Sequence, residues 1–469
     1  MAGVGRSFFA LASSFLLAHV VLAALNLLGN GYPLGDVTSV YLFWSDRAFT
    51  AGDWVGIDRE WVYPIAAIVP MLAAGIAYPF LEGVPALAHL YDGSELYATT
   101  WLAIVTALDL VAFGVLTGWG RRHDRFAVGW WWTAYLLALG PIALGRIDAV
   151  TVPIAIVGVL LVASRPRLAT VLLTVAAWIK VWPGAVVIAM AIMARSRWGV
   201  LGAAIATSAA IAAVAIGFGS GWNVLSFVSQ QAGRGLQVEA PISTPWMWLA
   251  SAGVPGADVY YDRDIFTWQV AGAGVDTVSS LMTPILLLAV AAIVALGIVT
   301  VRRGASARAA LPPLVLALVT GMIAFQKVGS PQFISWLAVP VVLGLVTHRA
   351  GVGPSFRAPA ALAFTIAALT HIIYPYLYGY LLGVYPAMLA VLTMRNALLF
   401  VLLGWAVIAI VRSSRWSSDS PRARMSEPRW RITRRPDRLE ERASLLGLAD
   451  RGHHARSVLG SSKRRAWIL

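Results

Sequence analysis

Asp36 is the residue with the clearest potential for chemistry, because it follows closely on a hydrophobic segment that can span a bilayer. Residues 7–29 are predominantly apolar, and about 20 residues at 1.5 Å each cross the hydrocarbon core. Asp36 therefore lies at the first membrane interface that the chain reaches. A carboxylate at this depth is costly unless it accepts a proton or pairs with a cation. Its position predicts a general base, and the alternative is an acidic loop at a helix end.

Cations, amides, carboxylates and aromatic side chains recur in further stretches that the predicted topology places toward the same face. Fixed cations can hold a phosphate leaving group, with Arg offering paired donors and Lys a point charge. Amides, carboxylates and flat aromatic faces bind sugars, and transfer to a hydroxyl needs a base within about 3 Å of its oxygen. The predicted substrate-binding residues are Tyr63, Arg146, Asp148, Lys180, Arg234, Gln237, Lys327, Gln332 and His371.

The cationic candidates also have structural interpretations. Lys180 and Lys327 are the only lysines of the hydrophobic body. Lys180 could extend to an interface without binding anything, and Lys327 could neutralise the carbonyl groups of a helix end. Arg234 could pair with Glu239 in a solvated loop.

The remaining candidates have similar alternatives. Asp148 could form an ion pair with Arg146, two residues before it in a short turn. His371 stands beside aromatic residues at the end of a span, where an interfacial histidine is common. Asp109 lies in the body of a span and must be paired or protonated, so we interpret it as structural.

The sequence offers little for metal or nucleotide binding. It contains no cysteine, which excludes disulfides and thiolate metal sites. Apart from Asp262 and Asp264 in one loop, no acids or histidines with ligand spacing converge, and no glycine-rich nucleotide loop is present. We therefore expect no metal and no cofactor.

The composition is that of a polytopic membrane protein. Of 469 residues, 59% are hydrophobic and 12% charged, and the mean hydropathy is +0.74, against roughly 25% charged residues in soluble domains. The first segment is long and lacks a cleavage site, so we expect a retained helix. Residues 412–469 hold 15 Lys and Arg and 6 Asp and Glu, or +9 of the net +14. We expect a disordered cytoplasmic tail near anionic membrane lipids, with no nucleic-acid partner.

Charge distribution predicts the topology. Thirteen of the 22 acids lie in segments 30–97 and 220–277, whereas basic clusters such as Arg121–Arg122 and His348–Arg349 lie in other loops. Basic loops face the cytoplasm, so the two acidic loops belong outside. The candidate spans are 7–29, 99–118, 127–145, 149–164, 199–219, 278–301, 311–325, 333–348, 358–373 and 391–411.

Two further apolar segments do not fit a single membrane span. Residues 168–194 lie between basic clusters and contain Lys180 and Pro183, so we expect two short helices that meet at Lys180 and return the chain to the same side. Residues 63–80 are apolar but contain three prolines, and we interpret them as a juxtamembrane or re-entrant helix. Together this predicts about 12 passes with both termini cytoplasmic and juxtamembrane helices in the two long outer loops.

The order of these motifs resembles the GT-C membrane glycosyltransferases of glycosyltransferase family eighty-seven, over residues 1–411. The family's best-known members are actinobacterial polyprenyl-phosphate-mannose-dependent α-mannosyltransferases, including the PimE type, which extends phosphatidylinositol mannosides. The resemblance lies in the order and spacing of several short motifs. These are Asp36 after the first span, Tyr63-Pro64, Lys180-x-x-Pro183 ahead of Arg197-Trp198, Arg234-Gly235-Leu236-Gln237, and Lys327-x-x-Ser330-Pro331-Gln332-Phe333-x-x-Trp336.

The resemblance implies a GT-C fold in the plasma membrane with its active site on the periplasmic or extracellular side. Asp36 matches the family's catalytic base, which activates a glycolipid hydroxyl to attack a β-linked polyprenyl-phosphate mannose. An α-mannoside would form on an acceptor such as a phosphatidylinositol mannoside. Where the family often has Gly-Gln-x-Asn, this chain has Gly145-Arg146-Ile147-Asp148, so an arabinose or glucose donor stays open. The alternative of another class is a transporter or flippase of lipid-linked glycans.

Overall fold

The computed structural model describes residues 2–89, 91–232, 234–263 and 265–413. Within them the chain is a bundle of helices with one small β-hairpin. The expected disordered tail, 412–469, lies outside the described residues from position 414 onward, so that expectation is untested.

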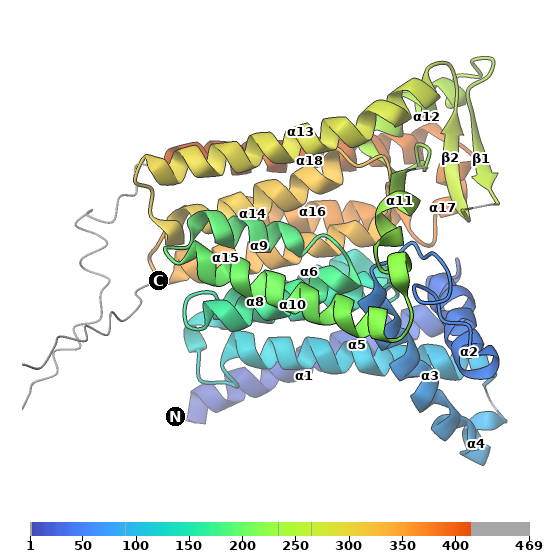
Figure 1. Cartoon of the computed structure of the whole chain (residues 1–469), viewed down its shortest axis with the longest axis horizontal. Coiled ribbons are helices and arrows are strands. Elements are labelled where there is room, and N and C mark those ends of the chain that lie inside the picture. The colour runs from blue at the N-terminus through green and yellow to red at the C-terminus, as the bar shows by residue number, and fades with distance from the viewer. Residues whose placement is uncertain (1, 90, 233, 264, 414–469) are drawn as a thin grey trace, which may run out of the picture.

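The two ends of the bundle differ in what they carry. Figure 1 shows the long helices running side by side, with the start of α1 (Ala2–Leu28) and the end of α18 (Pro386–Ser413) at one end. The hairpin of β1 (Asp258–Asp262) and β2 (Thr267–Ala271) lies at the opposite end. We call the first the basic end, because the chain turns there at its arginine-rich loops, and the second the hairpin end.

Nine helical stretches of the described residues are long and apolar enough to cross a membrane, in agreement with the predicted helical multi-pass protein. They are Ser7–Leu28, Ile65–Glu82, Gly93–Thr117, His123–Ala143, Arg197–Gly217, Val275–Arg302, Ala307–Ala324, Pro331–Arg349 and Pro386–Ser413. The helices in them not yet named are α3 (Ile68–Glu82), α5 (Gly93–Thr117), α6 (Phe126–Leu139), α10 (Arg197–Gly217), α13 (Val275–Arg302), α14 (Ala307–Ala324) and α15 (Ala338–Arg349). Short turns extend them, namely η2 (Ile65–Ala67), η3 (His123–Arg125), η4 (Gly140–Ala143) and η7 (Pro331–Leu337).

The broken hairpin expected around Lys180 is present. Helix α8 (Pro166–Ile179) ends where Lys180 becomes extended, and α9 (Gly184–Met193) begins directly after Pro183, whose ring cannot continue a helix. Pro166 and Ala194 line one cavity, so the two helices return the chain to the same end of the bundle. This places Lys180 at the tip of the reversal. The other short apolar helices are α7 (Asp148–Leu161) and α16 (Arg357–Ile373).

The first long loop, residues 29–92, begins and ends at the hairpin end. Asn26, near the end of α1, donates a hydrogen bond to the Pro141 carbonyl, and Trp101, near the start of α5, donates to that of Leu144. Although Ile65–Glu82 is long and apolar enough to cross a membrane, this return favours the juxtamembrane interpretation. The loop also contains η1 (Asp36–Tyr41), α2 (Leu42–Ala51) and α4 (Pro85–Ala88).

The second long loop packs part of its backbone onto the hairpin. The strands pair antiparallel with Tyr260 opposite Gln269, and the segment before them adds hydrogen bonds from the Val238 amide to Trp268 and from the Val270 amide to Leu236. Gln237 is therefore held in a regular, sheet-like position. Other elements here are η5 (Gly221–Leu225), α11 (Ser226–Ala232), η6 (Pro241–Ser243) and α12 (Thr244–Ser251); α17 (Tyr378–Leu382) follows α16.

Helix α14 forms the centre of the bundle, since it is almost entirely buried and packs against α9, α13, α15 and α18. Asp109 has the partner that a buried acid in a span requires: His19 of α1 places Nε2 3.0 Å from its Oδ2. The structural interpretation of Asp109 is thus supported. The GT-C fold and the count of 12 passes stay predictions.

Candidate active site

The candidate site is built around the turn that joins α6 to α7. Helix α6 ends at Leu139, because Gly140 has a φ of 75° and Pro141 lacks an amide hydrogen. The turn then carries Arg146, and α7 begins at Asp148. Gly145 allows the chain to pass close to the first long loop, since a Cβ there would lie 3.0 Å from the carbonyl oxygen of Pro33.

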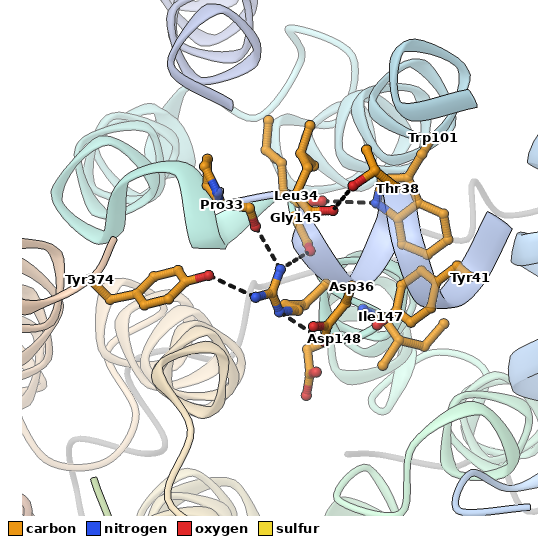
Figure 2. A network of polar contacts seen from close by, with 12 residues as sticks. Pro33, Leu34, Asp36, Thr38, Tyr41, Trp101, Gly145, Ile147, Asp148 and Tyr374 are labelled. Carbon is orange, nitrogen blue, oxygen red and sulfur yellow. Dashed lines mark hydrogen bonds and ion pairs between the residues drawn. The ribbon is translucent and has the colours of Figure 1, made fainter. Parts of the chain in front are cut away.

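Arg146 joins this turn to Asp36. Its Nε lies 3.1 Å from Oδ2 of Asp36, while Nη1 donates to the carbonyl oxygens of Pro33 at 2.6 Å and Gly145 at 2.8 Å. Nη2 donates to the hydroxyl of Tyr374 at 2.8 Å (Figure 2). The guanidinium is thereby fixed from four directions, and its orientation determines where the Asp36 carboxylate can lie.

The two partners differ in exposure. The side chain of Arg146 is 9% exposed and that of Asp36 is 40% exposed. Burial alone would lower the pKa of Arg146, but the charge of Asp36 and the neighbouring tyrosine hydroxyls outweigh it and raise this pKa above its ordinary value. Arg146 is therefore permanently cationic. The carboxylate of Asp36 is fixed in position by its ion pair with Arg146 but stays accessible to solvent. Such a group can accept a proton from a bound hydroxyl.

A second ion pair lies beside the first. Lys180 places its Nζ 3.6 Å from Oδ2 of Asp148, and the indole Nε1 of Trp336 donates to Oδ1 of Asp148 at 2.6 Å. The ammonium also lies 4.8 Å from the ring centroid of Tyr63 and 5.6 Å from that of Phe333, in cation–π contact with both. Since a lysine ammonium has three donors, this arrangement can still bind an anion.

Aromatic side chains pack beneath the ion pair of Lys180 and Asp148. Trp336 stacks on Trp182 at a centroid distance of 5.5 Å and an interplanar angle of 11°, and packs against Phe333 at 4.4 Å. Trp182 donates its own Nε1 to the hydroxyl of Thr151 at 3.0 Å. Asp148 and Lys180 are therefore positioned by a rigid, largely apolar platform.

Two tyrosines, the buried Tyr41 and the half-buried Tyr63, connect the pairs. The hydroxyl of Tyr41 accepts a hydrogen bond from the Ile147 amide at 3.1 Å, and Tyr41 and Tyr63 lie close enough to influence each other's pKa. Burial raises the pKa of Tyr63; Lys180 opposes this, and Asp36 and Asp148 add to it. Both hydroxyls are thus protonated at neutral pH and can act as donors.

Arg234 reaches the same neighbourhood from the second long loop. Burial lowers its pKa, and the electrostatic effect of Tyr63, whose ring contacts Lys180, opposes this shift, so Arg234 lies within electrostatic range of Tyr63. Its Nε and the Nε2 of Gln237 are buried without a hydrogen-bond partner among the described residues. Buried polar atoms of this kind are costly, and a bound ligand would satisfy them.

The loop that carries Lys327 is held against this segment. The amide of Gln237 donates to the carbonyl oxygen of Lys327 at 3.1 Å, and Gly329 approaches the backbone of Ala240 so closely that a Cβ would collide. Lys327 is buried, which lowers the pKa of its ammonium. The structure thus brings Arg234, Gln237 and Lys327 together at the level of the main chain.

Two structural alternatives from the sequence are wrong. Asp148 does not pair with Arg146; it pairs with Lys180, and Arg146 pairs with Asp36. Glu239 pairs with Arg395 of α18 at 2.6 Å, so it is not the partner of Arg234.

His371 and Gln332 are less closely tied to the ion pairs. The imidazole of His371 packs against Gly140 at the end of α6, where any side chain would collide with it. This contact favours the structural interpretation of His371. Gln332 is half-buried in η7, and its carbonyl oxygen accepts a hydrogen bond from Ser335.

Tyr374, Trp336 and Tyr41 belong to the site but were not among the predicted site residues. Tyr374 lies three residues after His371, and Trp336 ends the motif that begins at Lys327. Both therefore stood inside stretches already singled out. Their roles follow from hydrogen bonds to Arg146 and Asp148. Such bonds between distant segments cannot be predicted from a local sequence pattern.

Among the residues that the structure describes, no group of three or more His, Asp or Glu side chains could hold a metal ion. The expectation of a metal-free reaction stays a prediction. Compared with known proteins, the chain matches no family model, no curated protein and no solved structure.

Proposed function

We propose that this protein is an inverting membrane glycosyltransferase that transfers mannose from polyprenyl-phosphate mannose to a hydroxyl of a mannosylated glycolipid. The observation that supports this most is the surroundings of Asp36. One of its oxygens is held by buried Arg146, and its side chain is 40% exposed. The ring of Tyr63 nearby contacts Lys180 and lies within electrostatic range of Arg234. A base next to a cationic, aromatic-lined region suits an acceptor hydroxyl and a phosphate leaving group.

The proposed reaction is a single displacement. Asp36 accepts the proton of the acceptor hydroxyl, and that oxygen attacks the anomeric carbon of the β-linked donor. The bond between this carbon and the phosphate oxygen breaks, its electron pair leaves with polyprenyl phosphate, and an α-mannoside forms. Lys180 and Arg234 stabilise the charge of the leaving phosphate, and Arg146 orients Asp36.

The donor's polyprenyl chain would lie in the bilayer, so the reaction needs neither a nucleotide nor a resident metal. In this proposal the reaction takes place on the outer face of the plasma membrane and both termini are cytoplasmic, which the distribution of acidic and basic loops supports. A phosphatidylinositol mannoside is the proposed acceptor. Arabinose or glucose donors would use the same arrangement of charges.

An assay in detergent tests the proposal and separates it from transport. Purified protein receives polyprenyl-phosphate mannose and a mannosylated lipid, without GDP-mannose and with or without a chelator. The expected product is a longer glycolipid, formed equally well in both samples. A flippase would form no new bond in detergent. Product with GDP-mannose alone, or none with any polyprenyl-phosphate sugar, would contradict the assignment.

A further inference from the structure

A groove opens at the basic end of the bundle, between α6, α15 and α16. It has a volume of about 440 Å³ and is lined mainly by apolar side chains, among them Ala127, Trp131 and Phe364. Helix α16 begins in this groove and ends one residue before Tyr374, which binds Arg146 of the candidate active site. At 1.5 Å per residue the start of α16, at Arg357, is about 25 Å from that site.

Two arginines line the groove where the helices end. Arg349 is the last residue of α15 and Arg357 the first of α16, and both are exposed. Arg349 donates to the carbonyl oxygen of Asp124 at 3.1 Å, which holds it beside the start of α6. Their guanidinium groups thus lie at one end of the groove, where α15 ends and α16 begins.

The rest of the groove is largely apolar and extends along the first two turns of α16. The lining residues of that helix run from Arg357 to Thr365, about 12 Å at 1.5 Å per residue. Trp131 donates its Nε1 to the carbonyl oxygen of Ala360 at 3.2 Å, which fixes the indole in the floor. The groove therefore has a cationic end and an apolar body.

The charge around the groove is mainly positive. The sequence has no Asp or Glu between Asp276 and Asp419, so neither α15 nor α16 carries an acid. On the α6 side Asp124 is the acid of the turn, accompanied by Arg121, Arg122 and Arg125. The arginines on the α6 side and those of α15 and α16 would both attract an anion bound in the groove.

We propose that this groove binds one anionic phospholipid, with its phosphate at Arg349 and Arg357 and one acyl chain along Trp131 and Phe364. Arginine offers the paired donors that a phosphate accepts, and basic pockets between membrane helices bind anionic headgroups. A free phosphate would leave the apolar body uncovered. The proposal does not depend on the proposed glycosyl transfer.

Two variants of the full chain test the groove. Arg349→Gln with Arg357→Gln removes the charge, and Ala361→Trp fills the apolar body with an indole at an exposed lining position. The matched control is Arg302→Gln with Arg303→Gln, two exposed arginines in another loop of the basic end that do not line the groove. Each protein in detergent is titrated with phosphatidylglycerol, phosphatidylcholine and glycerol phosphate, with native mass spectrometry and the thermal unfolding midpoint as readouts.

We expect phosphatidylglycerol to bind and raise the unfolding midpoint of the parent protein and the control, with phosphatidylcholine and glycerol phosphate far weaker. The double arginine variant should lose about 30-fold in affinity, equal to about 2 kcal/mol at 1.4 kcal/mol per factor of ten. Ala361→Trp should lose binding while keeping its charges. Equal binding by all four proteins would overturn the proposal in favour of general surface attraction. Equal binding of glycerol phosphate would overturn the role of the acyl chain.

Discussion

Arg146 and Asp36 form the ion pair that organises the candidate active site, with Nε 3.1 Å from Oδ2. The arginine is buried and makes three further hydrogen bonds to Pro33, Gly145 and Tyr374, whereas the carboxylate has one stable cationic partner and stays accessible. The pair therefore has a fixed member and a reactive member. This asymmetry suits a general base, because a rigidly positioned partner must fix the orientation of the reactive carboxylate.

Replacing Asp36 by Asn should abolish most of the turnover while leaving the protein folded. Asparagine keeps the size of the side chain but cannot accept the acceptor's proton, and loss of a general base costs about 10²–10⁴ in rate. Initial rates with polyprenyl-phosphate mannose measure the change, with donor binding as a second readout. Glu60→Gln, an isosteric change at an exposed acid of the same loop, serves as the control. An Asn variant with more than about a tenth of the parent rate would exclude Asp36 as the base.

Replacing Arg146 by Gln should lower kcat by about 10- to 100-fold through misplacement of Asp36. Lysine should restore only part of the rate, because an ammonium cannot reproduce four contacts of a planar guanidinium. KM for the donor should change little, which distinguishes a positioning residue from a donor-binding one. Arg59→Gln, at an exposed arginine of the first long loop that pairs with Asp53, is the matched control. Full activity in Arg146→Gln would show that the ion pair has no catalytic role.

Lys180→Met should weaken the binding of polyprenyl phosphate by about 10- to 100-fold, since charge-assisted hydrogen bonds contribute about 1.5–3 kcal/mol. Methionine keeps the packing on Tyr63 and Phe333 but removes the charge. Product inhibition by polyprenyl phosphate is the direct measurement. Arg195→Met, at an exposed arginine where the chain turns into α10, controls for a general loss of positive charge. An unchanged inhibition constant would assign Lys180 to structure, as the partner of Asp148.

Several features of the site could be predicted from the sequence because their causes are local. The break at Lys180 follows from Pro183, and the accessible position of Asp36 follows from the length of the segment before it. The proximity of Arg234 and Gln237 to one another follows from their spacing. In each case a few neighbouring residues determine the outcome.

The pairing of charges could not be predicted, because it depends on elements far apart in the sequence. Arg146 and Asp148 are two residues apart, which suggests an ion pair, but side chains two apart at a helix start point in different directions. Each instead meets a charge from another segment, Asp36 and Lys180 respectively. Tyr374 and Trp336 were missed for the same reason, since an aromatic residue at a helix end is a common feature with no specific signal.

The pH dependence of donor-phosphate binding should reveal Lys327. Burial lowers the pKa of its ammonium, so this group loses its proton at a lower pH than an exposed lysine would. If it contacts the phosphate, binding of polyprenyl phosphate should weaken on the alkaline side, starting at a pH below the ordinary lysine pKa of about 10.4. Lys327→Arg keeps its charge at alkaline pH, so in this variant the loss of binding should occur at a higher pH. Identical alkaline limbs in both proteins would exclude Lys327 from phosphate binding.

Arg395 and Glu239 provide a test of how the second long loop is anchored. Arg395 lies in α18 and binds both the carboxylate and the carbonyl oxygen of Glu239 at 2.6 Å, and both side chains are almost fully buried. Arg395→Met should cost about 3–5 kcal/mol of unfolding free energy, because it leaves a buried carboxylate without its partner. The double change with Glu239→Gln should recover much of this loss.

The same pair predicts a pH dependence with a definite sign. Burial raises the pKa of Glu239, and Arg395 opposes that shift, so removal of the arginine should raise this pKa further. A folded state with a raised carboxyl pKa binds a proton that the unfolded state releases, so its stability falls as the pH rises. The unfolding midpoint of Arg395→Met should therefore approach that of the parent protein on acidification toward about pH 5. The double variant should lack this recovery, and a deficit that grows on acidification would show that Glu239 is not the group responsible.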